Sequence, residues 1–202
     1  MNRSDFDLGQ QNQSTDSKIV ASLERIAQAF RVLLWNESKT NGLSPIQMQV
    51  LIFLLHHGEE MRKVSYLASE FNMTKATISD TVKALEQKGL ISKEYDQYDT
   101  RSYCIHLSAA GKAIAGRTAL FTKELKAPIE LLDADDKENL LLSLIGIIRH
   151  LNKTGIITIQ RMCFTCSHYR PGPGGNGHFC QLINQSLAPT ELRVDCPEHL
   201  PM

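Results

Sequence analysis

The 202-residue chain lacks several features that would assign it to a class at once. It has 22 lysines and arginines against 22 aspartates and glutamates, so the net charge of +0 gives no global signature of nucleic-acid binding. No apolar run is long enough to span a membrane, and the polar start Met1-Asn-Arg-Ser lacks the apolar core of a signal peptide. We therefore expect a cytoplasmic protein with no membrane partner.

Catalytic constellations are also missing from the sequence. It shows no Ser/His/Asp arrangement and no carboxylate pair of the kind that active sites use, so we expect no enzymatic activity. What the sequence does contain, between Val64 and Gly111, is a short helix, a second helix of small polar residues and a hairpin in direct succession. That order predicts a winged helix-turn-helix and a mainly α fold of the α+β type.

The second helix of this pair is predicted to start at its N-cap Thr74 and to end near Lys88, before Gly89. Its apolar residues form one stripe, and short polar residues occupy the opposite face, as suits a helix that enters the major groove of double-stranded DNA. Lysines beside that face can meet phosphates, and Asp80 can accept a hydrogen bond from a cytosine amino group. The residues expected at the DNA are Thr74, Lys75, Ala76, Thr77, Ser79, Asp80, Lys83 and Lys93.

The hairpin is predicted from two alternating segments, residues 90–95 and 102–107, with a polar tip between them. A wing of this kind lies along the DNA backbone or reaches into the minor groove, where negative potential holds an arginine. We expect Arg101 in that role, with Asp99 orienting its side chain. An ordinary surface ion pair between the two is the alternative.

From Leu43 to Leu151 the chain resembles the MarR-type (multiple antibiotic resistance) transcriptional regulators. The resemblance rests on the segments Leu43-Ser-Pro-Ile-Gln, Leu67-Ala-Ser, Met73-Thr-Lys-Ala-Thr-Ile-Ser, Leu85-Glu-Gln-Lys-Gly-Leu-Ile, Asp99-Thr-Arg and Leu107-Ser-Ala-Ala-Gly. Two positions depart from the family pattern and remove positive charge. Thr100 stands where the wing usually has an arginine, and Asp80 stands where an arginine is frequent in the recognition helix.

The resemblance implies a homodimer and a pocket for a small-molecule effector between the dimer helices and the winged lobe. Phe30, Trp35 and Met48 are candidates to line that pocket, although each also fits an ordinary core position. Independently, the apolar residues between Asp135 and Lys153 spread beyond one helical stripe, which indicates burial on two sides. One side would pack on its own subunit and the other on a two-fold partner, placing the recognition helices about one DNA turn apart.

The last part of the chain holds four of the five cysteines among glycines and prolines. In a cytoplasmic protein such clustering predicts a metal site rather than disulfides, because disulfides do not persist there. The expected ligands are Cys163, Cys166, Cys180 and Cys196. His168, His178 and His199 are spare candidates that we do not assign.

The identity of the metal stays open at this point. Zn²⁺ is the default for four thiolates, but zinc ribbons usually carry two Cys-x2-Cys pairs and this tail has one. The single pair, the two widely spaced cysteines and the aromatic residues Phe164, Tyr169 and Phe179 are weakly similar to high-potential iron-sulfur proteins, so a [4Fe-4S] or other iron-sulfur cluster is the alternative. Zinc would make the tail a structural element, and a cluster would make it a sensor.

These patterns predict three parts. Residues 1–16 are expected to be disordered because they are rich in polar residues, residues 17–160 to form the winged-helix domain, and residues 161–202 to form a small metal-stapled tail. Within the domain, the DNA-binding lobe is expected at about 44–112 and dimerisation helices at about 17–40 and 113–158. We expect a dimeric sequence-specific transcriptional regulator, a repressor that responds to an effector or to redox or metal state. The alternatives are a winged-helix adaptor that binds protein, and a metal- or thiol-dependent redox protein.

Overall fold

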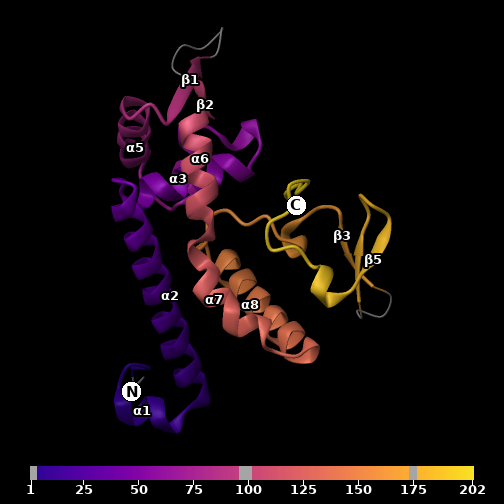
Figure 1. Ribbon diagram of the computed structural model, residues 1–202. Helices are drawn as coiled ribbons and strands as arrows, with labels where there is room; N and C mark the ends of the chain where they lie inside the picture. The colour runs from indigo at the N-terminus through magenta and orange to yellow at the C-terminus, as the bar shows by residue number, and fades with distance from the viewer. Residues whose placement is uncertain (1–3, 96–101, 173–176) are drawn as a thin grey trace.

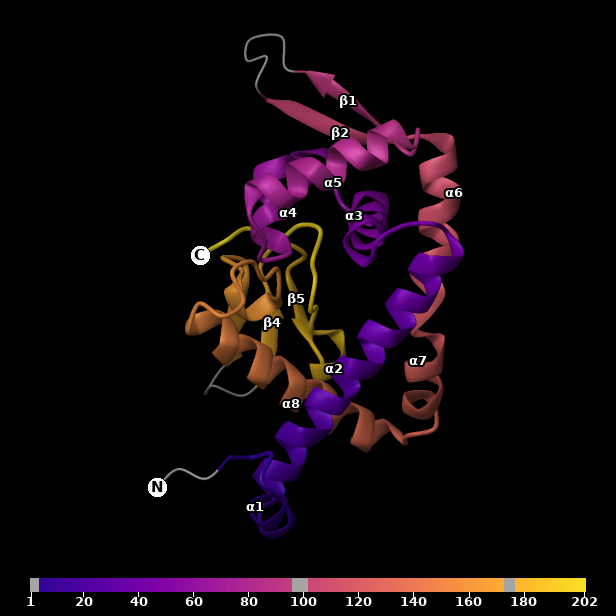
Figure 2. The ribbon, with the colours of Figure 1, turned by 90° about the vertical axis from the view of Figure 1, so that its left-hand side faces the viewer.

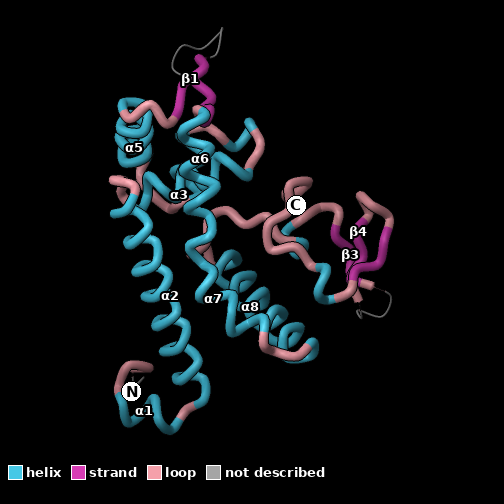
Figure 3. The backbone as a smooth tube through the Cα atoms, viewed as in Figure 1, coloured by secondary structure: helices cyan, strands magenta, loops and turns pink. Residues whose placement is uncertain are grey.

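The computed structural model describes residues 4–95, 102–172 and 177–202. A winged lobe lies at one end, long helices extend from it, and a small cysteine-rich unit lies beside them (Figure 1). Seen from the side, this unit lies between helix α4 of the lobe (Val64–Glu70) and the long helix α8 (Ala134–Lys153) (Figure 2). Strands occur in the wing and in the cysteine-rich unit, and helices make up most of the rest (Figure 3).

The N-terminal segment forms the short helix α1 (Leu8–Gln13) and the long helix α2 (Thr15–Thr40). This differs from the disordered segment that composition suggested for residues 1–16. The physical reason is local capping, since Asp7 accepts a hydrogen bond from the Gln10 amide at 2.9 Å and Ser14 accepts one from the Ser17 amide at 3.2 Å. The Ser17 hydroxyl also donates to Asp5 at 2.8 Å, which ties the start of α2 to the preceding turn.

The winged lobe follows the predicted order. Helix α3 (Pro45–His56) begins with a capping box in which Ser44 and Gln47 satisfy each other's main-chain amides. Helix α4 leads through a turn at Asn72, whose φ is 51°, into α5 (Lys75–Gln87). Strands β1 (Ile91–Tyr95) and β2 (Tyr103–Leu107) then pair antiparallel, with Lys93 opposite Ile105. The fold is therefore the predicted winged helix-turn-helix.

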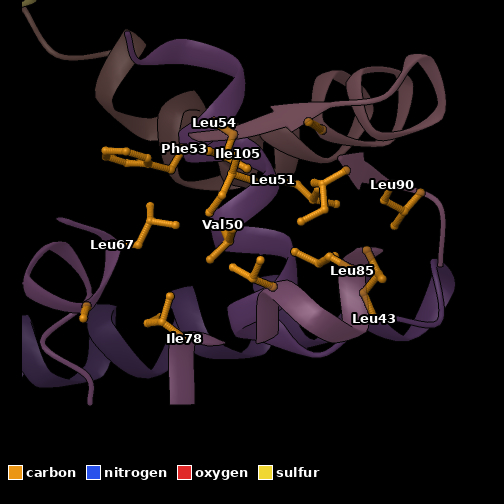
Figure 4. Close-up of a cluster of buried hydrophobic side chains, with 14 residues drawn as sticks. Leu43, Val50, Leu51, Phe53, Leu54, Leu67, Ile78, Leu85, Leu90 and Ile105 are labelled. Carbon is orange, nitrogen blue, oxygen red and sulfur yellow. The ribbon is translucent and has the colours of Figure 1, made fainter. Parts of the chain in front are cut away.

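The core of the lobe is an apolar cluster to which α3, α4, α5, β1, β2 and α6 (Ala109–Thr118) all contribute (Figure 4). Its completely buried members include Leu51, Leu54, Leu67, Ile78, Val82, Leu85 and Ile105. Ile78, Val82 and Leu85 are the apolar stripe of α5. Their burial fixes which face of α5 points outward.

After α6 the chain passes through η2 (Ala119–Thr122) into α7 (Lys123–Glu130) and then α8. A single helix from Ser108 to about Leu125 was predicted, but a 3-10 turn interrupts it after Thr118. Pro128 lies inside α7 rather than at a break. Asp133 caps α8 through the Asp136 amide at 2.8 Å. In the described parts of the chain, no helix combines the length and apolar character needed to cross a bilayer.

The tail folds as a unit of its own. It comprises η3 (Cys163–Thr165), strands β3 (Tyr169–Pro171), β4 (His178–Cys180) and β5 (Gln185–Leu187) in an antiparallel sheet of that order, and η5 (Pro189–Glu191). Its small core joins Met162 and Leu192 to Ile145 of α8. One of the two apolar sides of α8 is therefore covered by the tail, which the sequence did not indicate.

Candidate nucleic-acid interface and cysteine cavity

Helix α5 presents the predicted reading face to the outside. Thr74 caps it by accepting a hydrogen bond from the Thr77 amide at 3.1 Å. Seven of the predicted DNA contacts are exposed on or beside the helix, namely Thr74, Lys75, Ala76, Thr77, Ser79, Asp80 and Lys83. Short side chains dominate this face, so the helix backbone can approach base edges closely.

Lys93 is placed differently from the other predicted contacts. Its ammonium lies 2.7 Å from a carboxylate oxygen of Glu86 and over the ring of Tyr103, 5.1 Å from the centroid. The hydrogen bond to Glu86 is the main reason that the pKa of Lys93 is raised. Lys93 therefore joins the wing to the end of α5 and does not offer a free ammonium to a phosphate.

A shallow groove of ≈ 300 Å³ separates α5 from the wing. Lys75 and Ser79 of α5 line one side, and Lys63 and Ser65 at the start of α4 line another. Sequence reasoning missed Lys63 and Ser65, because a lysine before a short helix carries no DNA-binding pattern of its own. The predicted minor-groove residues Asp99 and Arg101, and Thr100 between them, lie outside the described residues.

The four predicted metal ligands lie around one cavity of ≈ 270 Å³. Cys163 and Cys166 flank the 3-10 turn η3, Cys180 ends β4, and Cys196 lies in the loop after η5. These four cysteines are up to 33 positions apart in the sequence, from 163 to 196, and they line the same cavity. Their role as metal ligands stays a prediction.

Two of these thiols have specific hydrogen-bond donors. The Arg193 amide donates to Cys163 Sγ at 3.3 Å, and the Arg193 guanidinium donates to Cys196 Sγ at 3.3 Å. Burial is the largest cause that raises the pKa of the Cys163 thiol, and the three neighbouring thiols raise it further.

The side chains as placed do not close on one point. Within residues 4–95, 102–172 and 177–202, no three His, Cys, Asp or Glu side chains are near enough to share a single ion. Two of the three spare histidines have other partners: His178 is hydrogen bonded to the Tyr169 hydroxyl at 2.8 Å and His199 to the Thr165 hydroxyl at 3.0 Å. The third, His168, lines the cavity together with the four cysteines.

The remaining cysteine, Cys104, lies on β2 in the wing. Its pKa is raised, first by burial and then by the carboxylate of Glu59. Both causes disfavour the thiolate, which is the reactive form.

The tail is joined to the DNA-binding lobe by one buried arginine. Arg161 is 7% exposed and lies two residues before Cys163. Its guanidinium donates to Glu70 at the end of α4 at 2.7 Å and to Asp195 at 2.6 Å. Asp195 in turn lies 3.1 Å from His57 at the end of α3. The carboxylates on either side raise the pKa of Arg161 against the cost of its burial.

This junction connects the cysteine loops directly to the helix-turn-helix. It comprises Arg161, Asp195, Glu70 and His57. The Arg161 carbonyl accepts the Cys196 amide at 2.9 Å, and Asp195 is the residue before Cys196. A second contact nearby runs from the Thr158 hydroxyl to the Ser69 carbonyl at 2.6 Å. Sequence reasoning missed the junction, because its residues are 91 or more positions apart across the lobe–tail contact and form no local pattern.

Comparison with known proteins agrees with this geometry. Residues 41–102 match the model of the MarR family. The chain is 28% identical over 114 residues to the HTH-type transcriptional repressor MdtR of Bacillus subtilis, covering 54% of this chain and 72% of the relative. It is 27% identical over 96 residues to the repressor YetL of the same organism, covering 48% and 58%.

Solved structures show the same fold. A MepR–DNA complex from S. aureus aligns with a TM-score of 0.57 at 20% identity, over 65% of this chain and 97% of that one. A MarR transcriptional regulator from Methanosarcina mazei Go1 aligns with a TM-score of 0.57 at 17% identity, over 67% and 97%. The aligned region covers nearly the whole length of each neighbour but only about two thirds of this chain. Residues 41–102 are therefore similar to the MarR family, and the winged lobe has the fold of these solved structures.

Proposed function

We propose that this protein is a homodimeric, sequence-specific transcriptional repressor that reads double-stranded DNA with α5. The observation that carries this function is the exposed face of short polar side chains on a capped α5, within a MarR-family lobe. The relatives named above are transcriptional repressors, not enzymes, and one structural neighbour is a DNA complex. A regulator of this kind acts with DNA in the cytoplasm.

The two sides of α5 have different tasks. Lys75 faces the groove that it shares with Lys63, where a phosphate of the DNA backbone fits between two ammonium groups. Asp80 lies on the exposed face, where it can accept a hydrogen bond from a cytosine amino group. Arg101 and Asp99 of the wing remain predicted minor-groove contacts.

The DNA proposal is tested with Lys75→Ala and Asp80→Asn on a duplex that the unmodified protein selects from a random pool. Lys75→Ala should weaken binding to all sequences and reduce the salt slope of affinity by about 1. Asp80→Asn should relax selection at one base pair by about 1–3 kcal/mol. Lys18→Ala is the control, because Lys18 is exposed near the start of α2, and that end of the helix lies far from the lobe (Figure 1). Equal effects of Lys18→Ala and Lys75→Ala would contradict the assignment of the face.

The partner subunit covers apolar side chains on the long helices. Ile26, Val32 and Trp35 of α2 are 46%, 58% and 52% exposed in the single chain, and Ile147 of α8 is 39% exposed. Large apolar side chains exposed in this number on two long helices are typical of an interface rather than of a solvated surface. A two-fold dimer through these helices sets the spacing of the two α5 helices on the DNA.

The signal of this repressor is carried by the tail, through a metal group held by Cys163, Cys166, Cys180 and Cys196. The four thiols share one cavity, and their loops hold Arg161 and Asp195. Loss of the metal group frees these loops, and the bond from Arg161 to Glu70 at the helix-turn-helix is lost with them. A small-molecule effector remains a second possible signal; of its candidate residues, Met48 is completely buried, whereas Phe30 and Trp35 are exposed.

Coupling between tail and lobe is tested with Arg161→Met. This variant should still hold its metal group, but its affinity for the selected duplex should no longer change when the group is removed. Arg170→Met is the matched control, because Arg170 is exposed and donates only to nearby carbonyls in the described structure. If Arg161→Met responds to metal removal as the unmodified protein does, the junction does not carry the signal.

A further inference from the structure

We infer that the cysteine cavity binds a [4Fe-4S] cluster rather than a single zinc ion, with each of Cys163, Cys166, Cys180 and Cys196 bound to one iron. The inference rests on the proposed metal-binding role of the tail and specifies its cofactor. The candidate geometry is four cysteines among the residues that line one cavity, contributed by one turn, one strand end and one loop.

The distances that zinc requires do not agree with this arrangement. Zinc–sulfur bonds are about 2.3 Å long, so four thiolates on one tetrahedral zinc lie about 3.8 Å apart and leave no space between them. In the described part of the chain no three candidate ligands converge on a point, whereas all four cysteines are among the residues that line a partly open cavity of ≈ 270 Å³. That space is several times the share of one water molecule in the liquid, about 30 Å³. A cubane fills it, because four irons and four sulfides stand between the thiolates.

The walls of the cavity suit a cluster in two further respects. Leu182, Ile183 and Leu187 line it, which limits water around the sulfur atoms. The Arg193 amide donates to Cys163 Sγ, and its guanidinium to Cys196 Sγ, both at 3.3 Å. Hydrogen bonds to cysteine sulfur and exclusion of solvent are what protein surroundings use to set the potential of a cluster. For the thiolates, the nearby guanidinium also offsets negative charge.

Binding is a ligand exchange that needs no oxidant. Each of the four thiols releases its proton to solvent as its sulfur bonds to an iron of the cluster. A preformed cluster passes from a cluster-assembly carrier, whose own ligands it leaves, and in a test equal amounts of ferrous and ferric iron with sulfide, added without oxygen, supply the two Fe²⁺ and two Fe³⁺ of the cluster.

The experiment uses the full chain, purified without oxygen, and measures iron, acid-labile sulfide and zinc per chain together with the visible spectrum. About four irons and four sulfides per chain, with a broad visible absorption, are expected. One zinc in a colourless chain would overturn the cluster and leave the metal-binding tail intact as a proposal. A chain that takes up neither metal, even after incubation without oxygen with ferrous and ferric iron plus sulfide, or with Zn²⁺, would overturn both.

Variants locate the cluster. Cys180→Ser should lose the visible absorption and most of the iron, whereas Cys104→Ser, in the wing, should retain both. Arg193→Gln keeps all four ligands and removes the guanidinium donor to Cys196, so it should retain four irons with a shifted reduction potential. Unchanged iron content in Cys180→Ser would place the cluster elsewhere. Binding of each variant to the selected duplex is measured separately, so a failure of the cluster is distinguished from a failure of DNA recognition.

Discussion

Gly111 occupies a position in the lobe where no side chain fits. It lies in the first turn of α6, and its amide donates to the Ser108 cap at 3.0 Å. A Cβ at Gly111 would lie 2.0 Å from the carbonyl oxygen of Leu90, the residue that leads into the wing. The requirement here is close packing of the helix on the wing, since the two nearest atoms belong to the main chain of Leu90 and only the third, Leu107 Cδ2 at 3.3 Å, belongs to a side chain.

Gly111→Ala should therefore destabilise the protein by about 1–3 kcal/mol, the usual cost of forcing atoms into a packed site. Gly116→Ala on the same helix is the control. Its Cβ would meet nothing within 4 Å, so the substitution should raise stability by about 0.5–1 kcal/mol through helix propensity. Urea denaturation of both variants measures the difference. A Gly111→Ala protein as stable as the parent would show that Leu90 can move away.

At the scale of elements, the cap of α5 determines how the reading face is held. Thr74 accepts the Thr77 amide, and the two hydroxyls are also hydrogen bonded at 2.8 Å. Thr74→Ala should cost about 1 kcal/mol of unfolding free energy, because an N-cap oxygen is lost. Thr74→Ser keeps that oxygen and should cost much less. Hydrogen exchange at the amides of the first turn of α5 compares the two, and equal protection in both variants would contradict the cap's role.

Local chemistry explains why the helix starts were predictable. Ser44, Thr74, Ser108 and Asp133 were each expected at or just before a helix start, and each is an N-cap in the structure. The burial stripe of α5 followed from its apolar spacing, and so did the exposure of its other face. Helix α1 was not predicted, because a polar composition says little about capping. The end of α6 was also missed, since no glycine or proline marks it.

Contacts across long separations were beyond sequence reasoning. The clustering of four cysteines indicated that they belong together, but not the size of the space they enclose. In the sequence, Arg161 is an ordinary arginine before a cysteine pair. Only the fold shows that it lies between Glu70 and Asp195. The apolar residues of α8 indicated two buried sides, and only the packing of Ile145 on Met162 showed that the tail covers one of them.

At the scale of the whole molecule, the dimer makes one further prediction. Ile26→Glu puts a charge on an apolar residue of α2 that is 46% exposed in the single chain. Burying that carboxylate against a partner subunit is costly, so the dimer dissociation constant should rise at least about tenfold, which corresponds to about 1.4 kcal/mol. Sedimentation equilibrium measures it. Asn36→Glu, also exposed on α2, is the control, and an equal effect of both would argue for general charge repulsion.

The position of the tail also determines the order in which the protein matures during synthesis. Residues 41–118 contain every element of the DNA-binding lobe, so this lobe can fold before residues 161–202 leave the ribosome. Until then Glu70 has no arginine beside it, and Ile145 of α8 is uncovered. A newly made chain therefore passes through a stage in which the helix-turn-helix is complete but the tail is absent. Under the proposed coupling, the youngest copies of the protein in a growing cell form a small population that binds DNA without any response from the tail.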